Sequence, residues 1–249
     1  MSCWRIIKSS FLNPAMNLAM EESLLRVRLE KSKSNVLWFW VNTPSIILGC
    51  FSILDELNLA KCKELKIPAL RRISGGGAVY HDLGNLNYTV IANSGKNGLP
   101  TDVLEVYKLI SDCLIDGLNC LNVPLNFLPP NSILLNKKKV GGMAQHLLYN
   151  ITLIHGTLLV NANLNLMKEL IKLKFPVANL SEAGNLSIKE VEEMLVNGFK
   201  KRLNVLFNSS FFTKEELKLA EKLFKIKYSK NWWNLGFNFM KKQNPFILD

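Results

Sequence analysis

The stretch RRISGGGAVYHDLGNLN, residues 71–87, determines the fold and function that we expect for this chain. It joins two arginines to three consecutive glycines and then to the pair His81-Asp82. Adjacent glycines give up side-chain packing and cost conformational entropy, so the backbone there must need freedom or a close approach to another group. Bare main-chain N–H groups flanked by Arg71 and Arg72 could form a nest for an anion such as a nucleotide phosphate.

A tight turn is the alternative interpretation of the glycine run. The common phosphate motifs do not decide the question, because no GK[ST] follows and no helix begins directly after the glycines. The downstream residues alternate as in a strand, with Leu86, Tyr88 and Val90 set against Asn87, Thr89 and Ile91. We therefore expect a glycine loop between two strands, able to lie over a ligand bound on a sheet.

Composition limits the class of protein. The 249 residues are 48% hydrophobic and 20% charged, a globular composition that allows one large or two small domains with a substantial core. No repeat, low-complexity tract or evident linker divides the chain, so we expect one domain. The chain has 31 Lys+Arg and 20 Asp+Glu, and the resulting net charge of +11 fits an acidic or phosphorylated partner. Nucleic acid is disfavoured as that partner, because the lysines are dispersed and no zinc-finger or homeodomain pattern is present.

The cysteines and the apolar runs indicate the compartment. Five cysteines form no CxxC pair, which argues for reduced thiols and against a structural zinc site. Nothing at the N-terminus resembles a signal peptide, and no apolar run approaches the roughly 20 residues needed to cross a bilayer. We therefore expect a cytoplasmic protein that does not act at a membrane.

Hydrophobic periodicity and turn signals predict alternating strands and helices. Strands are expected at residues 4–7, 36–40, 45–48, 68–72, 86–91 and 152–161, and helices at 14–29, 55–65, 188–203, 214–224 and from 103 onward. In the first helix, Glu21 and Glu22 are expected at a solvated edge. Cys113 and Cys120 are expected to be buried structural thiols, and Trp232-Trp233 to anchor the C-terminal segment to the core.

The basic triplet 137–139 lies before Gly141 and Gly142. By composition such a triplet is a solvated turn. The alternative is that Lys139, at the start of a strand, points its ammonium into the same cavity as the glycine loop. A lone histidine in a strand, His155, is by itself most often a core or rim group, although Gly156 beside it would let another group approach closely.

Three separated motifs together resemble the lipoate–protein ligase family, which is grouped with biotin–protein ligases and lipoyl/octanoyl transferases. They are the glycine stretch, KVGGMAQ at 139–145 and HGTLLVNANL at 155–164. Further resemblance lies in NLAMEESLL at 17–25 and NWWNLG at 231–236, so it covers nearly the whole chain in the family's order. It implies an α/β (α+β) fold with a mixed, mostly antiparallel sheet flanked by helices. The expected organisation is one catalytic domain over residues 1–249, without the family's C-terminal accessory domain.

The resemblance also implies an activity. An ATP-dependent ligase would activate lipoate as lipoyl-AMP and transfer the lipoyl group to a lysine of an acceptor, with Mg²⁺ bridging the phosphates of ATP. The implied acceptors are lipoyl domains of 2-oxoacid dehydrogenase E2 subunits or the H protein of glycine cleavage. A separate small accessory-domain protein is implied as a possible further partner.

Site residues follow from the same resemblance. Lys139 matches the family's lysine before Val-x-Gly and is the expected catalytic residue. The expected ATP-binding residues are Arg72, Gly75, Gly76, Gly77, Ala78, Val79, Tyr80 and Lys139. The expected lipoate-binding residues are Ser74, His81, Lys139, Gly142, His155, Gly156 and Thr157, and no protein ligand to a metal is expected.

The chain departs from the family pattern in several places, one of them at Val41, which follows Trp40 where the family has an arginine soon after the tryptophan. Cys50-Phe51-Ser52 stands where the family often carries Arg-x-Gln, and Phe51 there could line an acyl pocket. Ser132 replaces an aspartate, and the loop 175–180 lacks the family's arginine.

Two other functions remain open from the sequence. A lipoyl/octanoyl transferase would work through a cysteine thioester, and the absence of cysteine from residues 126–130 and 142–156 favours the ligase instead. A non-catalytic lipoyl-binding paralogue is the third possibility.

Overall fold

The computed structural model describes residues 2–32, 34–95 and 98–236. Its strands are β1 Ser2–Lys8, β2 Val36–Trp40, β3 Ser45–Leu48, β4 Ala69–Arg71, β5 Val79–His81, β6 Asn85–Asn93, β7 Leu125–Leu128, β8 Ser132–Leu135, β9 Lys138–Leu148, β10 Ile151–Leu159 and β11 Val205–Ser209. Its α-helices are α1 Pro14–Glu30, α2 Leu59–Glu64, α3 Val103–Leu118, α4 Leu164–Leu170, α5 Ile188–Leu203, α6 Lys214–Leu223 and α7 Asn231–Asn234. Short 3₁₀ turns are η1 Leu54–Glu56, η2 Asn119–Leu121 and η3 Leu180–Ala183, and η4 Phe224–Tyr228 is π-helical.

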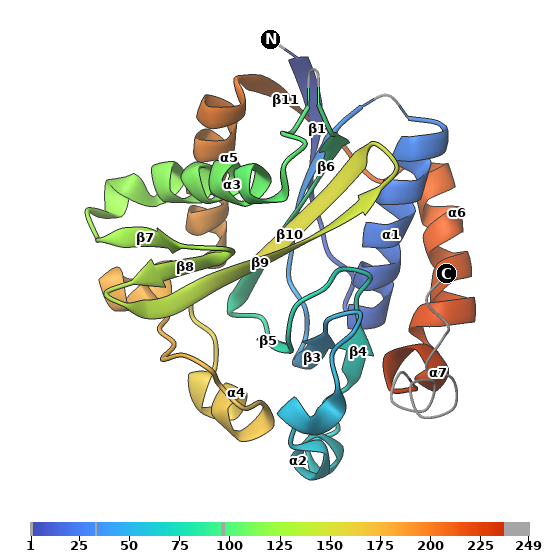
Figure 1. Ribbon diagram of the computed structural model, residues 1–249, viewed down its shortest axis with the longest axis vertical. Helices are drawn as coiled ribbons and strands as arrows, with labels where there is room; N and C mark the ends of the chain where they lie inside the picture. Colours follow the sequence, from blue (N-terminus) through green and yellow to red (C-terminus); the bar gives the residue numbers. More distant parts are fainter. Residues whose placement is uncertain (1, 33, 96–97, 237–249) are drawn as a thin grey trace.

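The strands described here form two sheets (Figure 1). The larger has eight strands in the order β11-β1-β2-β6-β10-β9-β8-β7. Only β1 makes parallel pairs in it, with β11 and β2, and every other neighbouring pair is antiparallel. The smaller sheet has the order β4-β3-β5. The expected mixed, mostly antiparallel sheet with flanking helices is confirmed.

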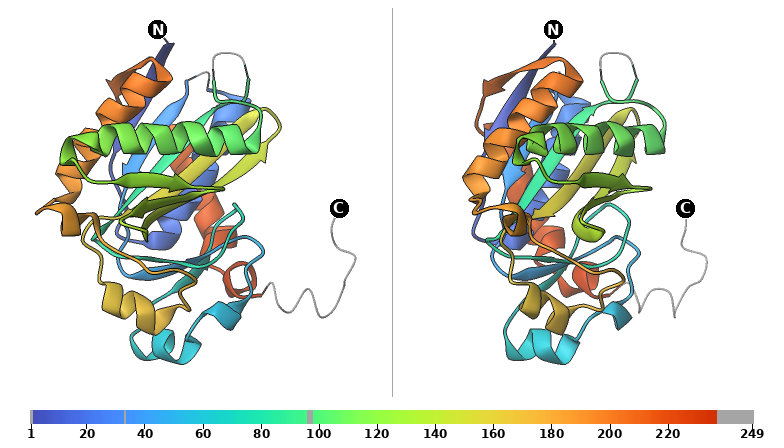
Figure 2. Two further views of the ribbon diagram at one scale, coloured as in Figure 1. Left: turned by 60° about the vertical axis from the view of Figure 1, so that its left-hand side comes forward. Right: turned by 90° about the vertical axis from the view of Figure 1, so that its left-hand side faces the viewer.

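Each face of the large sheet is covered by its own pair of helices (Figures 1 and 2). Helices α3 and α5 pack together on one face, and α1 and α6 pack together on the other. Strand β2 illustrates this arrangement, because all five of its residues are buried and they alternate between the two faces. Leu37 and Phe39 join the core under α3 and α5, whereas Trp38 and Trp40 join the core under α1 and α6.

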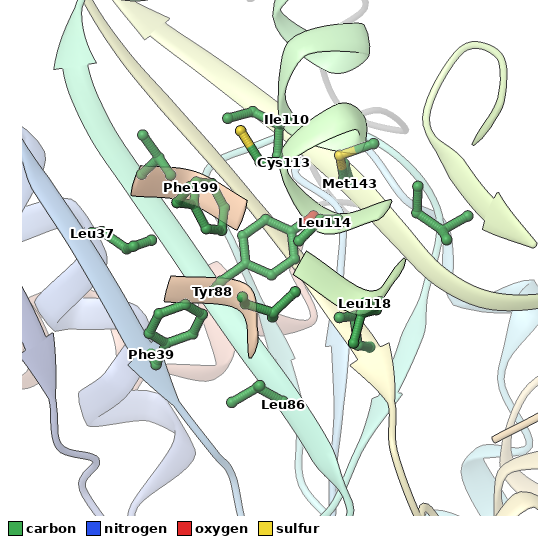
Figure 3. Packing of buried hydrophobic residues seen from close by; sticks show 14 of the residues in the cluster. Leu37, Phe39, Leu86, Tyr88, Ile110, Cys113, Leu114, Leu118, Met143 and Phe199 are labelled. Carbon is green, nitrogen blue, oxygen red and sulfur yellow. The ribbon is translucent and has the colours of Figure 1, made fainter. Parts of the chain in front are cut away.

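The core under α3 and α5 is built around Tyr88 of β6, whose ring lies among Phe39, Leu114 and Phe199 (Figure 3). The two helices approach closely because a glycine lies at their crossing. A Cβ on Gly198 would stand 2.1 Å from the carbonyl oxygen of Cys113, a distance that no side chain tolerates. Cys113 is buried there as expected, but Cys120 is exposed, because it follows the end of α3 in η2.

Helix α1 begins as its sequence predicts, with the Asn13 side chain accepting a hydrogen bond from the N–H of Ala15 and Pro14 in the first turn. The prediction of a solvated edge at Glu21 and Glu22 is wrong, because each is only 2% exposed. Glu22 is buried because it accepts hydrogen bonds from Lys227 Nζ at 2.7 Å and Tyr228 Oη at 2.6 Å. These groups and Arg26 hold the pKa of Glu22 below its usual value although burial raises it.

The small sheet holds the glycine stretch in place. Strands β4 and β5 both pair with β3, which lies between them, so the segment that joins β4 to β5 must cross the end of β3. It does so at Gly49, where a Cβ would stand 1.9 Å from the carbonyl oxygen of Gly76. The expected helix at 55–65 is shorter than predicted and is split into η1 and α2.

The C-terminal segment of the described chain is joined to β4. Asn234 Oδ1 accepts a hydrogen bond from the N–H of Arg71, and Trp233 Nε1 donates to the carbonyl of Arg71. The Lys227 ammonium lies 3.9 Å from the centre of the Trp233 ring. Trp233 therefore anchors the segment as expected, but Trp232 is 55% exposed and does not.

Among the described helices, none combines the length and the apolarity required to cross a bilayer.

The close crossing of α3 and α5 gives a test of the packing. Gly198→Ala should lower the free energy of unfolding by about 1–3 kcal/mol, because the new methyl group would meet backbone that has to shift. The measurement is denaturant unfolding followed by circular dichroism. Asn197→Ala, an exposed position one residue earlier in α5, is the matched control and should be close to neutral. Equal stability of the two variants would contradict this account of the crossing.

Candidate functional site

A cavity of about 280 Å³ opens on the face of the large sheet that carries α1, at the side where the small sheet and the segment 167–177 meet it. It gathers segments that are far apart in the chain: the glycine loop after β4, the start of β9, the middle of β10 and residues of α1. The sequence-predicted residues that line it are Arg72, Gly76, Gly77, Ala78, Val79, His81, Lys139, Gly142, His155, Gly156 and Thr157. Ser74, Gly75 and Tyr80 do not line it.

Strand pairing brings the second and third motifs together. In the antiparallel pair of β9 and β10, Gly142 is opposite Thr157 and Ala144 is opposite His155. Directly opposite residues point to the same face of a sheet, so these four positions all face the cavity. Gly142 keeps that face open, because a Cβ there would stand 3.1 Å from Lys139 Nζ.

Lys139 extends its side chain over Gly142 into the cavity. It is half-buried, and within the described part of the chain no carboxylate forms an ion pair with it. Burial lowers the pKa of the Lys139 ammonium. The exposed neighbour Lys138 instead pairs with Glu182 at 3.2 Å. The sequence alternative of a solvated turn therefore describes Lys138 but not Lys139.

The segment that lacks the family's arginine is attached to Lys139 by its backbone. The N–H of Lys139 donates to the carbonyl of Pro176 at 2.8 Å, and the N–H of Ala178 donates to the carbonyl of Lys139 at 3.1 Å. Lys172 and Lys174, two cations that the sequence did not single out, line the cavity from this segment. Cationic side chains therefore reach the cavity from the residues just before the loop.

Arg72 organises the glycine loop from inside. Its guanidinium donates to Ser74 Oγ and to the carbonyls of Ile47, Gly75 and Gly77. Burial lowers its pKa to about 10, so the group remains a cation at neutral pH. Since these carbonyls accept from Arg72, the loop is held in one conformation before any ligand binds.

The turn that departs from the family pattern supports the same loop. Ser52 Oγ donates to the carbonyl of Gly76 at 2.7 Å, and the N–H of Cys50 donates to the carbonyl of Ser74. Arg71 holds this turn in place by donating hydrogen bonds to the carbonyls of Gly49, Cys50 and Ser52. Phe51 is 60% exposed and does not line the cavity, so the expectation that it lines an acyl pocket is wrong.

One backbone N–H of the glycine loop is already hydrogen-bonded to a carboxylate. The N–H of Ala78 donates to Glu56 Oε2 at 3.1 Å, and Lys174 Nζ lies 2.6 Å from Glu56 Oε1. The hydrogen bond from Lys174 holds the pKa of Glu56 below its usual value. Glu56 lines the cavity, and no pattern in the sequence singled it out. The loop amide is therefore oriented to bind an anion, with a cation beside it.

A buried chain of hydrogen bonds runs from the glycine loop to α1. Arg72 Nε donates to Ser74 Oγ, which lies 2.5 Å from His155 Nε2. His155 Nδ1 is 2.7 Å from Glu21 Oε1, which also accepts from Thr89 Oγ1 at 2.6 Å. Because Ser74 Oγ accepts from Arg72, its hydroxyl hydrogen is free to donate to His155 Nε2, and Nδ1–H then donates to Glu21. This network explains the burial of Glu21.

His81 is held neutral beside the cavity. Asn17 Nδ2 donates to Asn42 Oδ1, so the amide group of Asn42 is left to donate to His81 Nδ1 at 3.0 Å. Burial, and after it the nearby positive charge of Arg72, lowers the pKa of His81 to about 3. Tyr80, the residue before it in β5, is buried in the separate core between the small sheet and α4.

The walls of the cavity also include apolar side chains that the motifs did not single out, among them Leu18, Trp40 and Met143. One polar residue among them is unusual. Asn87 of β6 is 1% exposed, and neither its Nδ2 nor its Oδ1 has a hydrogen-bond partner among the described residues. A buried carboxamide without partners is rare in a folded protein. In the sequence, only the alternation of Asn87 with Leu86 and Tyr88 indicated which face of the sheet its side chain lies on.

A protein built in this way, with an anion-binding glycine loop and a partly buried lysine in one apolar-walled cavity, suits the binding of an anionic group together with an apolar tail. The family model "Lipoyl protein ligase A/B catalytic domain" matches residues 13–200. The chain belongs to this family, which confirms the resemblance seen in the three motifs.

Two solved lipoate–protein ligases share the fold of this chain, whereas a curated relative that matches in sequence is an octanoyltransferase. The bipartite lipoate–protein ligase of Thermoplasma acidophilum, reported with its E2 lipoyl domain, is 28% identical, with a TM-score of 0.87 over 95% of this chain and 98% of that one. A lipoate–protein ligase A bound with ATP is 29% identical, with a TM-score of 0.87 over 95% and 100%. Octanoyltransferase LipM of Brevibacillus brevis is 28% identical over 94% of this chain and 99% of the relative.

The neutral His81 predicts how stability depends on pH. Its pKa is about 3 in the folded protein and 6.5 when exposed, so protonation favours unfolding. The stability that it contributes is complete above pH 6.5 and is lost as the pH falls toward 3. Between about pH 7 and pH 4.5, the native chain should lose about 2 kcal/mol more of its unfolding free energy than His81→Gln does.

Urea unfolding of both proteins at the two pH values measures this difference, and the carboxylates that they share cancel from it. Parallel losses in the native protein and in His81→Gln would show that His81 is not buried in its neutral form.

Proposed function

We propose that this chain is an ATP-dependent lipoate–protein ligase. It would activate lipoate as lipoyl-AMP and pass the lipoyl group to a lysine of an acceptor lipoyl domain. The observation that carries the proposal is the half-buried ammonium of Lys139, which has no carboxylate partner among the residues described and shares one cavity with an anion-binding glycine loop. The ATP-bound ligase among the similar structures supports the same activity.

The chemistry requires a charge of this kind. In the first step, a carboxylate oxygen of lipoate attacks the α-phosphorus of ATP, and pyrophosphate leaves with the electron pair of the broken P–O bond. Negative charge then develops on the α-phosphate oxygens. Lys139 is placed to stabilise that charge, and its partial burial strengthens the interaction. Mg²⁺ bound to the phosphates of ATP would neutralise further charge and needs few protein ligands of its own.

The glycine loop has a complementary part. Its carbonyls are bound to Arg72, and the N–H of Ala78 is oriented toward an anion that in this structure is the Glu56 carboxylate. A nucleotide phosphate would replace Glu56 on that amide and on Lys174. In the second step, the amine of the acceptor lysine attacks the acyl carbon and AMP leaves. Because the loop is fixed in advance, little of the binding energy is lost in ordering it.

The arrangement of cysteines favours a ligase over a transferase. A transferase that forms an acyl thioester needs a reactive thiol beside the lysine. All five cysteines lie among the described residues, and none of them lines the cavity. The N–H of Cys50 donates to the carbonyl of Ser74 beside the glycine loop, but burial raises the pKa of the Cys50 thiol, whereas a nucleophile needs a lowered one. The similarity to LipM is therefore interpreted as a shared fold with a different reaction.

The acceptor that we propose is the lipoyl domain of a 2-oxoacid dehydrogenase E2 subunit or of the glycine cleavage H protein. The net charge of +11 would favour encounter with an acidic domain. The similarity to a bipartite ligase reported with its E2 lipoyl domain supports this acceptor and a separate accessory subunit as partners.

Replacement of Lys139 tests the proposal. Lys139→Met keeps the length of the side chain and removes the charge, so it should lower the rate of lipoyl-AMP formation by at least about a hundredfold. The assay follows pyrophosphate release with lipoate and Mg·ATP, with an accessory protein added where one is needed. Lys138→Met, which removes the exposed neighbouring charge, is the matched control and should retain activity.

Full activity of Lys139→Met would eliminate the role assigned to this ammonium. Absence of lipoyl-AMP with the unaltered chain under every condition, while lipoate still binds, would instead favour the non-catalytic paralogue.

A further inference from the structure

The unpaired carboxamide of Asn87 is the feature of the cavity that adenylation alone does not explain. Asn87 lines the cavity, is 1% exposed, and has no partner for either polar atom among the residues described. Neighbouring polar groups do not supply one. Trp40 Nε1 donates to Thr89 Oγ1, and Thr157 Oγ1 accepts from Asn85 Nδ2. The carboxamide is therefore left facing whatever fills the cavity.

The position of Asn87 relative to Lys139 follows from the strand register. Lys139 Nζ lies over Gly142 of β9, Gly142 is opposite Thr157 of β10, and Thr157 is opposite Asn87 of β6. Side chains in such a row point to the same face of the sheet, and all of these positions line the cavity. Two strand spacings separate Gly142 from Asn87, which is roughly 10 Å. That is the order of length of an extended octanoyl chain.

The row continues beyond Asn87 into apolar surface. Trp40 of β2 is opposite Asn87, and Leu18 of α1 also lines the cavity. An acid whose carboxyl group lies at Lys139 would therefore place its methylene groups over Thr157 and its far end between Asn87 and Trp40. A plain hydrocarbon end would leave the carboxamide unpaired in a dry environment, which is unfavourable.

We propose that Asn87 selects an acid that carries sulfur at its far end, namely lipoate, over octanoate. The sulfur atoms of the dithiolane ring are weak hydrogen-bond acceptors, as the thioether sulfur of methionine is, and the Asn87 amide can donate to them. Octanoate has the same chain length and offers no acceptor there. This inference rests on the proposed function, because it places the carboxyl group of the acid at Lys139.

Direct binding measurements test the selection without needing turnover. Isothermal titration of the unaltered chain with lipoate and with octanoate should show lipoate binding about tenfold tighter, the contribution of one modest hydrogen bond. In Asn87→Leu, which keeps the size of the side chain and removes its polar atoms, the two acids should bind within about twofold of each other. Most of that change should be a loss of lipoate affinity.

Two further variants make the result specific. Asn126→Leu makes the same substitution at an exposed position of β7 outside the cavity, and it should keep the preference of the unaltered chain. Asn87→Val, whose branched side chain suits a strand, provides a second apolar replacement in case Asn87→Leu does not fold. Thermal melting shows which variants are folded.

The outcomes separate this inference from the proposed function. An unaltered chain that binds neither acid would remove the ligase proposal and this one with it. Binding of both acids with a ratio unchanged in the folded Asn87 variants would overturn the role of Asn87 alone. Tighter binding of biotin, whose ureido ring offers both donor and acceptor groups, would replace lipoate as the acid that Asn87 selects.

Discussion

The half-buried ammonium of Lys139 is the constraint on which the rest of the site depends. A cation loses hydration free energy on entering a cavity, and here no described carboxylate compensates for that loss. The surrounding structure has to hold it in place by other means. The backbone of Lys139 is bonded on one side to Pro176 and Ala178, and Gly142 removes the side chain that would otherwise displace the ammonium. The charge is therefore available to a substrate anion.

Arginine and carboxylate side chains elsewhere in the site serve mainly to position its parts. Arg72 is fully engaged with loop carbonyls and with Ser74, and Glu21 orients His155. Glu56 shows what the loop amide and Lys174 bind together, which is an oxygen anion. Of the charged groups around the cavity, Lys139 alone among those described here has partial burial and no ionic partner, and this difference is the reason that we propose it as the residue that contacts the reacting groups.

Motif and periodicity predicted much of this structure, because they depend on local chemistry. The starts of α1, α5 and α6 at residues 14, 188 and 214 and the strands around the glycine loop follow from short-range rules and are confirmed. Glu21, Glu22, Glu56 and Asn87 were not predicted to matter, because their surroundings come from residues far away in the chain. A carboxylate on a helix looks the same in sequence whether its partner is water or a histidine on a distant strand. Trp233 was predicted as an anchor, yet its contact with Arg71 could not have been foreseen.

The contact between Trp233, Asn234 and Arg71 has a consequence for where this fold can be divided. The family match ends at residue 200, yet the residues beyond it supply β11 to the edge of the large sheet, α6 to the surface of α1, and the bonds that fix β4. A fragment cut at that boundary would expose the apolar face of α1 and release the strand that leads into the glycine loop. The cooperative folding unit is therefore longer than the segment that the family model matches, and truncations designed from the family boundary would yield insoluble material.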